Sequence, residues 1–196
     1  PIHPSIRSKI AKFCNVTTDA VIESIDAPTI YDVPLLMQKE KLDEVVLKKL
    51  KVKSTQKPNL TQWNKFLKRY KEPKHEVNIG LIGKYVELKD AYKSIAEAFN
   101  HSGSANETKV NVHWIHSENL FSKNVSNTIK NLDGVLVAPG FGSRGIDGKI
   151  EAIKFVRENN IPFVGICLGM QMATIEFARN VLGWKDAHST EMKEYT

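Results

Sequence analysis

The sequence predicts an α/β protein in which a doubly wound parallel sheet follows a helical segment. From residue 76 onward, apolar runs alternate with amphipathic stretches, as in strands joined by right-handed helical crossovers. The polar stretch 54–59 contains a proline and separates this alternating part from a helix-rich beginning. With 41% hydrophobic and 26% charged residues among 196, the composition is that of a globular protein of one or two domains.

We expect three parts along the chain: a C-terminal part of a first domain over 1–53, a linker over 54–75 and a second domain over 76–196. The first part is too short to bury a convincing core by itself. It contains one strand-like run, 20–25. The linker contains a short amphipathic helix, for which Asn59 is the predicted N-cap.

Apolar residues at helical spacing predict a helix at the start of the chain: Ile6, Ile10 and Phe13. Cys14 follows this stripe, so we interpret it as a core residue rather than a reactive thiol. Pro34 fits the first turn of a further helix, because a proline there removes no hydrogen bond.

The second domain is predicted to contain four strands and four helices in alternation. The strands are expected over 77–83, 109–116, 134–140 and 161–167, and the helices over 89–103, 117–132, 148–160 and 168–183. The first of these helices is expected to end at Gly103 and to turn four residues inward: Ala91, Ile95, Ala98 and Phe99. Ligands bind such sheets at the carboxyl ends of the strands, which is where we look for a site.

Composition and charge argue for a cytosolic protein without a membrane or nucleic-acid partner. No apolar run approaches the roughly 20 residues of a membrane span, and the start of the chain does not look like a signal peptide. Two unpaired cysteines favour a reducing compartment. The net charge of +6 is concentrated at 48–57 and 64–74, which read as solvated surface because aromatic residues are not interleaved there as stacking requires. No cysteine–histidine spacing predicts a zinc site, so no metal ligands are assigned.

The string "GICLG" places Cys167 where a strand is predicted to turn into a helix. A nucleophile in such a sharp turn needs small residues two positions before and two after, and here these are Gly165 and Gly169. The helix that follows favours a thiolate through its positive end, and the N–H of Leu168 is a natural oxyanion donor. The alternative is that the glycines serve only close packing and that Cys167 is a buried, inert residue.

A glycine-rich loop over 138–149 follows the preceding strand and favours the catalytic interpretation. Its N–H groups can face a developing negative charge, and Gly140 is the best placed donor. Pro139 has no N–H, so it cannot act as a donor. The alternative, a phosphate-binding loop, lacks the glycine and lysine spacing of known nucleotide motifs.

These residues resemble the glutaminase domain of class I glutamine amidotransferases, through "GICLGMQ" and "PGFGSRG". Three further strings narrow the resemblance to the cytidine triphosphate (CTP) synthase family: "GLIGKYVELKDAYKSIAEAF", "DAHSTE" and "AVIESIDAPTIYDVPLL". The resemblance covers nearly the whole chain in order. It implies a flavodoxin-like glutaminase domain, preceded by the helical end of a P-loop-type synthetase domain.

The resemblance implies that the enzyme uses ammonia from glutamine to aminate uridine triphosphate (UTP) at the expense of ATP. It makes Cys167 the nucleophile, and it assigns glutamine and the oxyanion to Gly140, Leu168, Gly169, Met170, Gln171 and Glu191. It assigns the pyrimidine nucleotide to Lys9, the adenine of ATP to Ile25, Asp26 and Ala27, and a link with the activator GTP to Lys93. It also implies magnesium, with ligands outside this sequence, and a homotetramer.

Four departures from the family pattern are visible: Ala138, Pro139, His188 and Met192 replace a proline, a glycine, an asparagine and a phenylalanine. The family's general base is a histidine oriented by a glutamate in a "His-Pro-Glu"-like string, and these 196 residues contain none. We therefore expect the chain to be part of a longer protein and to hydrolyse glutamine poorly alone. Within the chain, His188 is the alternative base.

Two other readings remain open at this stage. The chain can belong to a cysteine hydrolase of the same fold, or to a glutaminase that serves another synthetase. It can also be a non-catalytic binding or oligomerisation remnant that uses the basic linker. The segment 1–57 argues against a stand-alone hydrolase, which has no use for it.

Overall fold

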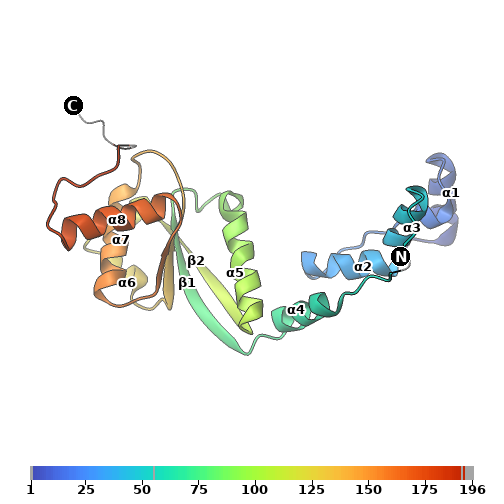
Figure 1. Cartoon of the computed structure of the whole chain (residues 1–196), viewed down its shortest axis with the longest axis horizontal. Helices are drawn as coiled ribbons and strands as arrows, with labels where there is room; N and C mark the ends of the chain where they lie inside the picture. Colours follow the sequence, from blue (N-terminus) through green and yellow to red (C-terminus); the bar gives the residue numbers. More distant parts are fainter. Residues whose placement is uncertain (1, 55, 191, 193–196) are drawn as a thin grey trace. The chain divides into compact units, whose positions relative to one another are not determined.

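The computed structural model describes residues 2–54, 56–190 and 192, and its described part divides into two compact units (Figure 1). Unit 1 spans residues 1–67 and unit 2 spans residues 68–196. Helix α4 (Thr61–Lys71) contains the division between them. The expected functional boundaries at 53 and 75 stay a prediction.

Unit 2 is built on a parallel sheet of four strands with the order β2-β1-β3-β4. The strands are β1 (His75–Gly83), β2 (Thr108–His116), β3 (Gly134–Val137) and β4 (Phe163–Gly165). In this order β1 and β3 are the two central strands. The chain continues from β1 to β2 on one side and from β3 to β4 on the other, so the carboxyl ends of β1 and β3 flank a topological switch point. This confirms the predicted doubly wound sheet.

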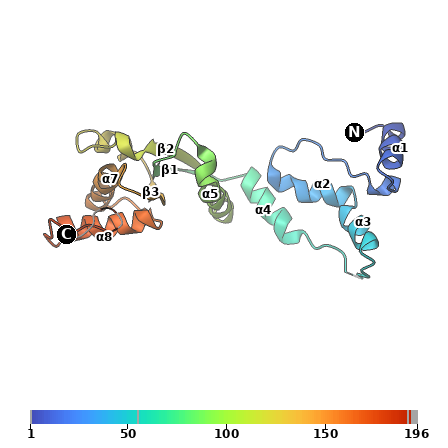
Figure 2. The ribbon, with the colours of Figure 1, turned by 90° about the horizontal axis from the view of Figure 1, so that it is seen from above.

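Alternation along the central strands separates two cores on opposite faces of the sheet. Leu81 and Leu136 face one core, which Ile95 and Phe99 of helix α5 (Lys93–Ala105) cover. Their neighbours Ile82, Val135 and Val137 face the larger core, which is covered by helices α6 (Val125–Ile129), α7 (Ile146–Glu158) and α8 (Leu168–Asn180). Figure 2 shows α5 on one side of the strands and α7 with α8 on the other.

Helices α7 and α8 are joined by an ion pair between the half-buried Arg157 and the buried Glu176. Arg157 donates to both carboxylate oxygens of Glu176, at 2.8 and 3.0 Å, and Glu176 is almost fully buried. The hydrogen bond and the charge of Glu176 raise the pKa of Arg157 further. Pairing with a positively charged side chain is one of the few ways to keep a carboxylate inside a protein core.

The helix after β1 differs from its prediction at both ends. It begins as a 3₁₀ turn, η3 (Lys89–Tyr92), and α5 continues past Gly103 to Ala105. Gly103 is therefore not a helix stop: a Cβ there would lie 2.5 Å from the carbonyl oxygen of Thr108, so it allows α5 to approach β2. Ala91 and Ala98 are exposed, and only Ile95 and Phe99 point inward as predicted.

The segment 117–132, predicted to be mostly helical, is helical over only half of its length. It contains a 3₁₀ turn, η4 (Ser117–Asn119), and the short helix α6. The side chain of Asn124 is bonded to Phe121 N and Asn119 O, at 2.8 Å each, and so stabilises a turn between the two. Local side-chain bonds of this kind compete with helix formation.

Unit 1 is helical. It contains α1 (Pro4–Phe13), α2 (Val33–Lys39) and α3 (Leu42–Lys49), with 3₁₀ turns η1 (Thr18–Ala20) and η2 (Ile30–Asp32). Pro34 lies in the first turn of α2, as predicted. The strand expected over 20–25 is wrong, because these described residues pair with no other strand.

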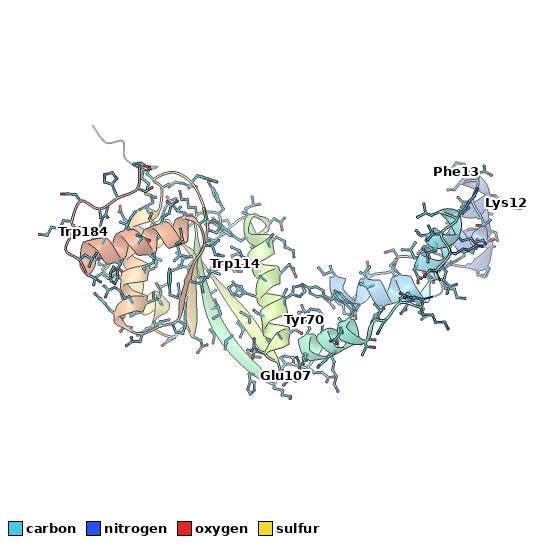
Figure 3. The ribbon with its side chains drawn as sticks, in the orientation of Figure 1. Lys12, Phe13, Tyr70, Glu107, Trp114 and Trp184 are labelled. Atoms are coloured by element: carbon cyan, nitrogen blue, oxygen red, sulfur yellow. The ribbon has the colours of Figure 1, made fainter. Side chains whose placement is uncertain are left out.

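The first helix forms as predicted, but its apolar stripe is not a core in the described chain. Ile6 and Ile10 are exposed, and Phe13 is 94% exposed (Figure 3). Cys14 is exposed as well, so its interpretation as a core residue is wrong. The spacing of α1 identified the helix correctly but could not show which face has a partner.

The linker helix α4 is fixed to η2 by aromatic contacts within unit 1. Trp63 Nε1 donates to the carbonyl oxygen of Tyr31 at 2.8 Å, and the rings of Tyr31 and Phe66 lie edge to face with centroids 5.0 Å apart. Asn59 caps α4 as predicted, because its Oδ1 accepts from Thr61 N at 3.0 Å. In the described part of the chain, none of the helices is long and apolar enough to cross a membrane.

Candidate active site

Cys167 occupies a sharp turn between β4 and α8. Its backbone has φ 50° and ψ −106°, a combination that is strained for a residue with a side chain. Ile166 N still donates to Val137 O at 3.1 Å, as in the sheet, and Gln171 N already donates to Cys167 O at 3.1 Å, as in the helix. The cysteine therefore forms the whole corner between strand and helix.

The two flanking glycines allow this corner to pack against the sheet. A Cβ on Gly165 would lie 2.6 Å from the carbonyl carbon of Gly169. A Cβ on Gly169 would lie 2.2 Å from the carbonyl oxygen of Val137 in β3. Both distances are too short for any larger residue, so the corner requires the two glycines.

The thiol of Cys167 is exposed, so the alternative of a buried, inert cysteine does not describe it. Cys167 is the N-cap residue of α8, and its side chain makes no capping hydrogen bond. The first N–H groups of a helix have no partner within that helix, and the helix dipole is positive at this end. An exposed thiol in this position is suited to react as a thiolate.

The glycine-rich loop lies beside the corner, as the sequence predicts. A Cβ on Gly140 would lie 3.5 Å from Leu168 Cδ2, so this glycine is a neighbour of the residue that follows the cysteine. Gly142 and Gly145 both have φ +71°, a conformation that favours glycine. These two positions let the loop turn sharply between β3 and α7.

Two buried lysines lie beneath this loop, and sequence reasoning did not identify them. An added Cβ on Gly140 would lie 3.7 Å from Lys84 Cε and 3.8 Å from Lys149 Nζ. Burial, together with the charge of Lys84, lowers the pKa of Lys149 to about 8, while Cys167 acts in the opposite direction. Burial and then Arg144 lower the pKa of Lys84.

The first turn of α8 contributes one unpaired polar group. Gln171 Oε1 is buried and accepts no hydrogen bond from the described residues. A buried acceptor without a donor costs free energy, roughly 1–3 kcal/mol, so a ligand donor near it would be stabilising. Leu168 is fully buried and fixes the turn, whereas Met170 is 58% exposed beside it.

Of the remaining predicted site residues of unit 2, the structure describes Lys93 and His188. Glu191 lies outside the described residues. Lys93 is on the surface of α5 and forms an ion pair with Glu97 at 2.8 Å, and the hydrogen bond to Glu97 raises its pKa. His188 is half-buried, with Nδ1 3.2 Å from Ser189 O, so its role as an alternative base stays a prediction.

The predicted nucleotide residues belong to unit 1. Lys9 is exposed on α1, and Ile25 and Asp26 are exposed in the segment after η1. Ala27 beside them is half-buried. A cavity of about 180 Å³ opens next to this segment and is lined by Glu23, Ile25, Leu36, Lys39 and Glu40.

One sequence signal could have identified Lys149. It occupies position i of an apolar set at i, i+3, i+4 and i+7 on α7, and every member is buried: Lys149, Ala152, Ile153 and Val156. A lysine on the apolar face of a helix at the carboxyl end of a sheet is unusual. Lys84 follows directly after the last residue of β1, at the same carboxyl end of the sheet.

The described geometry agrees with the comparisons to known proteins. A sequence model of the family "Glutamine amidotransferase class-I" matches residues 87–195, which is more than half of the chain. The chain belongs to the class I glutamine amidotransferase family. The model "CTP synthase N-terminus" matches residues 1–52, the part before the linker.

Relatives of this class I amidotransferase confirm the resemblance to CTP synthases stated above. The chain is 64% identical to the CTP synthase of Flavobacterium johnsoniae over 97% of its own length, and 54% identical to that of Methanocaldococcus jannaschii over 100%. It covers 36% and 37% of these relatives. The chain thus spans about a third of the length of the curated relatives that it matches.

A solved structure also matches the amidotransferase fold. The structure titled "Trypanosoma brucei CTPS - glutaminase domain with bound acivicin" is 40% identical, with a TM-score of 0.56. The match covers 59% of this chain and 45% of that one. It confirms the glutaminase fold that the resemblance implied.

The resemblance to CTP synthases implies ATP and magnesium, and the described residues of unit 1 fit these two ligands only in part. The cavity beside Ile25 has an apolar wall of Ile25 and Leu36, which suits a flat base such as adenine. Among the described residues, no three or more histidine, cysteine or acidic side chains are grouped as a metal site. We therefore derive no step through magnesium.

Proposed function

We propose that this chain supplies the glutamine-hydrolysing site, and part of the nucleotide-binding domain, of an enzyme that aminates UTP to CTP with ATP. The observation that carries the proposal is the exposed Cys167 thiol in its strained corner, at the positive end of α8 and beside the glycine-rich loop. The 64% identity to a CTP synthase and the match of 1–52 support the choice of product.

In the proposed reaction, Cys167 Sγ attacks the side-chain carbonyl carbon of glutamine. The new C–S bond pushes the carbonyl electron pair onto oxygen, and the N–H groups of Leu168 and Gly140 stabilise that oxyanion. When the carbonyl re-forms, the C–N bond breaks and ammonia leaves with a proton from a general acid. Water then hydrolyses the thioester, which releases glutamate and regenerates the thiol.

The first turn of α8 and its neighbours are proposed to hold the substrate. The unpaired Gln171 Oε1 can accept a hydrogen bond from glutamine. Gly169 and Met170 are proposed to contribute to the same glutamine-binding region. Glu191 is proposed to bind the α-amino group, because a carboxylate pairs well with an ammonium ion. The proton carrier is proposed to be a histidine–glutamate pair elsewhere in the protein, with His188 as the alternative.

The synthetase part is proposed to bind the nucleotides. Lys9 contacts the pyrimidine nucleotide, and Ile25, Asp26 and Ala27 border the adenine of ATP beside the small cavity of unit 1. Lys93 is proposed to respond to the activator GTP. Magnesium, a homotetramer and a cytoplasmic location complete the proposal by resemblance to the family.

An electrophilic glutamine analogue tests the site directly. We expect it to label the full-length protein at Cys167 with a stoichiometry of about one per chain, because Cys167 is exposed and lies at the N-terminal end of α8. Peptide mass spectrometry locates the label, and the exposed Cys14 in the same chain is the internal control that should remain unlabelled. Absence of label at Cys167, with glutamine hydrolysis intact, would contradict the assignment.

Nucleotide binding separates this proposal from a glutaminase that serves another synthetase. If the protein forms CTP, UTP and ATP bind with a requirement for Lys9, so Lys9→Ala weakens UTP binding without changing the label at Cys167. Calorimetric titration measures both nucleotides. A protein that is labelled at Cys167 but binds neither UTP nor ATP belongs to the alternative class.

A further inference from the structure

Lys84 and Lys149 are used by none of the steps proposed above. Lys84 is 2% exposed and Lys149 is 0% exposed. Lysine is almost never buried to this extent, because its ammonium group loses hydration in the protein interior. Two such residues beside one loop therefore indicate a specific role.

Both ammonium groups bind carbonyl oxygens of the glycine-rich loop. Lys149 Nζ donates to Ala138 O at 3.0 Å, before Gly140 in the chain. Lys84 Nζ donates to the carbonyl oxygens of Phe141 and Gly142, after Gly140, with 2.9 Å to Gly142. The loop is thus fixed on both sides of the proposed oxyanion donor.

The backbone of each lysine is itself held in place. Tyr92 Oη accepts from Lys84 N at 3.0 Å, directly after β1 ends. Beside Lys149, a Cβ on Gly148 would lie 1.8 Å from Ser117 O, so the first turn of α7 is pressed against η4. The backbone from which each lysine side chain extends is therefore fixed by packing.

The two positive charges repel each other and need a compensating anion. Lys84 lowers the pKa of Lys149, and Arg144 lowers that of Lys84, while Glu118 acts on Lys84 and Cys167 on Lys149 in the opposite direction. With a pKa of about 8, Lys149 is still mostly protonated at pH 7. An added Cβ on Gly140 would lie 3.8 Å from Lys149 Nζ and 3.5 Å from Leu168 Cδ2, so an oxyanion held by the N–H groups of Gly140 and Leu168 would lie close to this positive charge.

We propose that Lys84 and Lys149 are positioning residues of the glutaminase site: they fix the loop around Gly140 and supply the charge that stabilises the anion at Cys167. This rests on the proposed function, because that anion is first the thiolate and then the oxyanion of the thioester reaction. The two lysines act through the position of the loop and through their positive charge, and neither is required to touch glutamine.

Alkylation of Cys167 by iodoacetamide as a function of pH tests the proposal in the full-length protein. In Lys149→Met we expect the rate at pH 7 to fall about tenfold, and the rate–pH profile to move to higher pH, because the positive charge that favours the thiolate is lost. At high pH, where every thiol is ionised, the two rates should converge. A loss of reactivity by the same factor at all pH values would overturn the role of charge.

Three further variants separate charge from folding. Lys149→Gln keeps a donor for Ala138 O but removes the charge, so its alkylation profile should match that of Lys149→Met. Lys84→Gln, if it folds, should shift the profile in the same direction. Lys154→Met removes a lysine from the same helix without a bond to the loop, and it should behave as the wild type. Thermal unfolding checks that each variant is folded.

Turnover gives a second readout. For Lys149→Met we expect kcat for glutamine hydrolysis to fall at least about tenfold, with KM for glutamine within about twofold, because the lost interaction acts on the anion rather than on the bound substrate. Wild-type turnover and unchanged alkylation profiles in both Lys149 variants would refute the role of the two lysines. They would leave the proposed function intact. A wild-type Cys167 that reacts no faster than Cys14 and supports no glutamine hydrolysis would refute the proposed function itself.

Discussion

Cys167→Ala is expected to abolish glutamine-dependent CTP formation in the full-length protein while ammonia-dependent formation continues. The substitution removes the sulfur that forms the thioester, so glutamine hydrolysis should fall about 1,000-fold or more. Free ammonia bypasses that step, and the synthetase part keeps its nucleotides. Parallel assays with glutamine and with an ammonium salt measure the two activities.

The matched control for this experiment is Cys14→Ala. Cys14 is the other free cysteine, it is exposed, and it lies at the end of α1 in unit 1. We expect both activities of Cys14→Ala to remain within about twofold of the wild type, since surface substitutions rarely matter. Loss of both activities in Cys167→Ala, in a protein that remains folded, would contradict the proposed division of labour.

Gly169→Ala is expected to damage both stability and glutaminase activity. The new methyl group would lie 2.2 Å from the carbonyl oxygen of Val137, so α8 or β3 must move. Overpacking of a core typically costs about 1–3 kcal/mol of unfolding free energy, and here we expect about 3 kcal/mol because the obstacle is backbone. A shift of the corner by about 1 Å can also lower turnover about 100-fold.

Gly140→Ala is the matched control for stability. A methyl group at Gly140 would meet its nearest atom, Leu168 Cδ2, at 3.5 Å, an ordinary contact distance. Its unfolding free energy should therefore change by less than about 1 kcal/mol. Chemical denaturation measures both variants, and equal stability of Gly169→Ala and the wild type would show that the corner is looser than described.

Local patterns predicted the sheet because each βα unit carries its own signal. The runs 77–83, 109–116, 134–140 and 161–167 all form strands, although β3 and β4 are shorter than the runs. The corner at Cys167 was also predictable, since its two glycines encode the close approach. These features depend on residues that are near one another in the sequence.

Features that depend on distant partners, or on local hydrogen bonds of side chains, were missed. The apolar stripe of α1 was identified but has no buried partner in the described chain, and Gly103 serves contact with β2 rather than a helix end. The segment 117–132 looked helical, yet side-chain bonds of Asn124 hold a turn there. Lys84 and Lys149 come together only after β1 and α7 pack around the same loop.

The central claim is that glutamine becomes covalently attached to the sulfur of Cys167. It is tested most directly by acid quenching of the full-length protein during steady-state glutamine hydrolysis, followed by mass spectrometry of the peptide that contains Cys167. We expect a γ-glutamyl group on that peptide, and none on the peptide of Cys14. Rapid hydrolysis with the glutamyl group on another residue would contradict it.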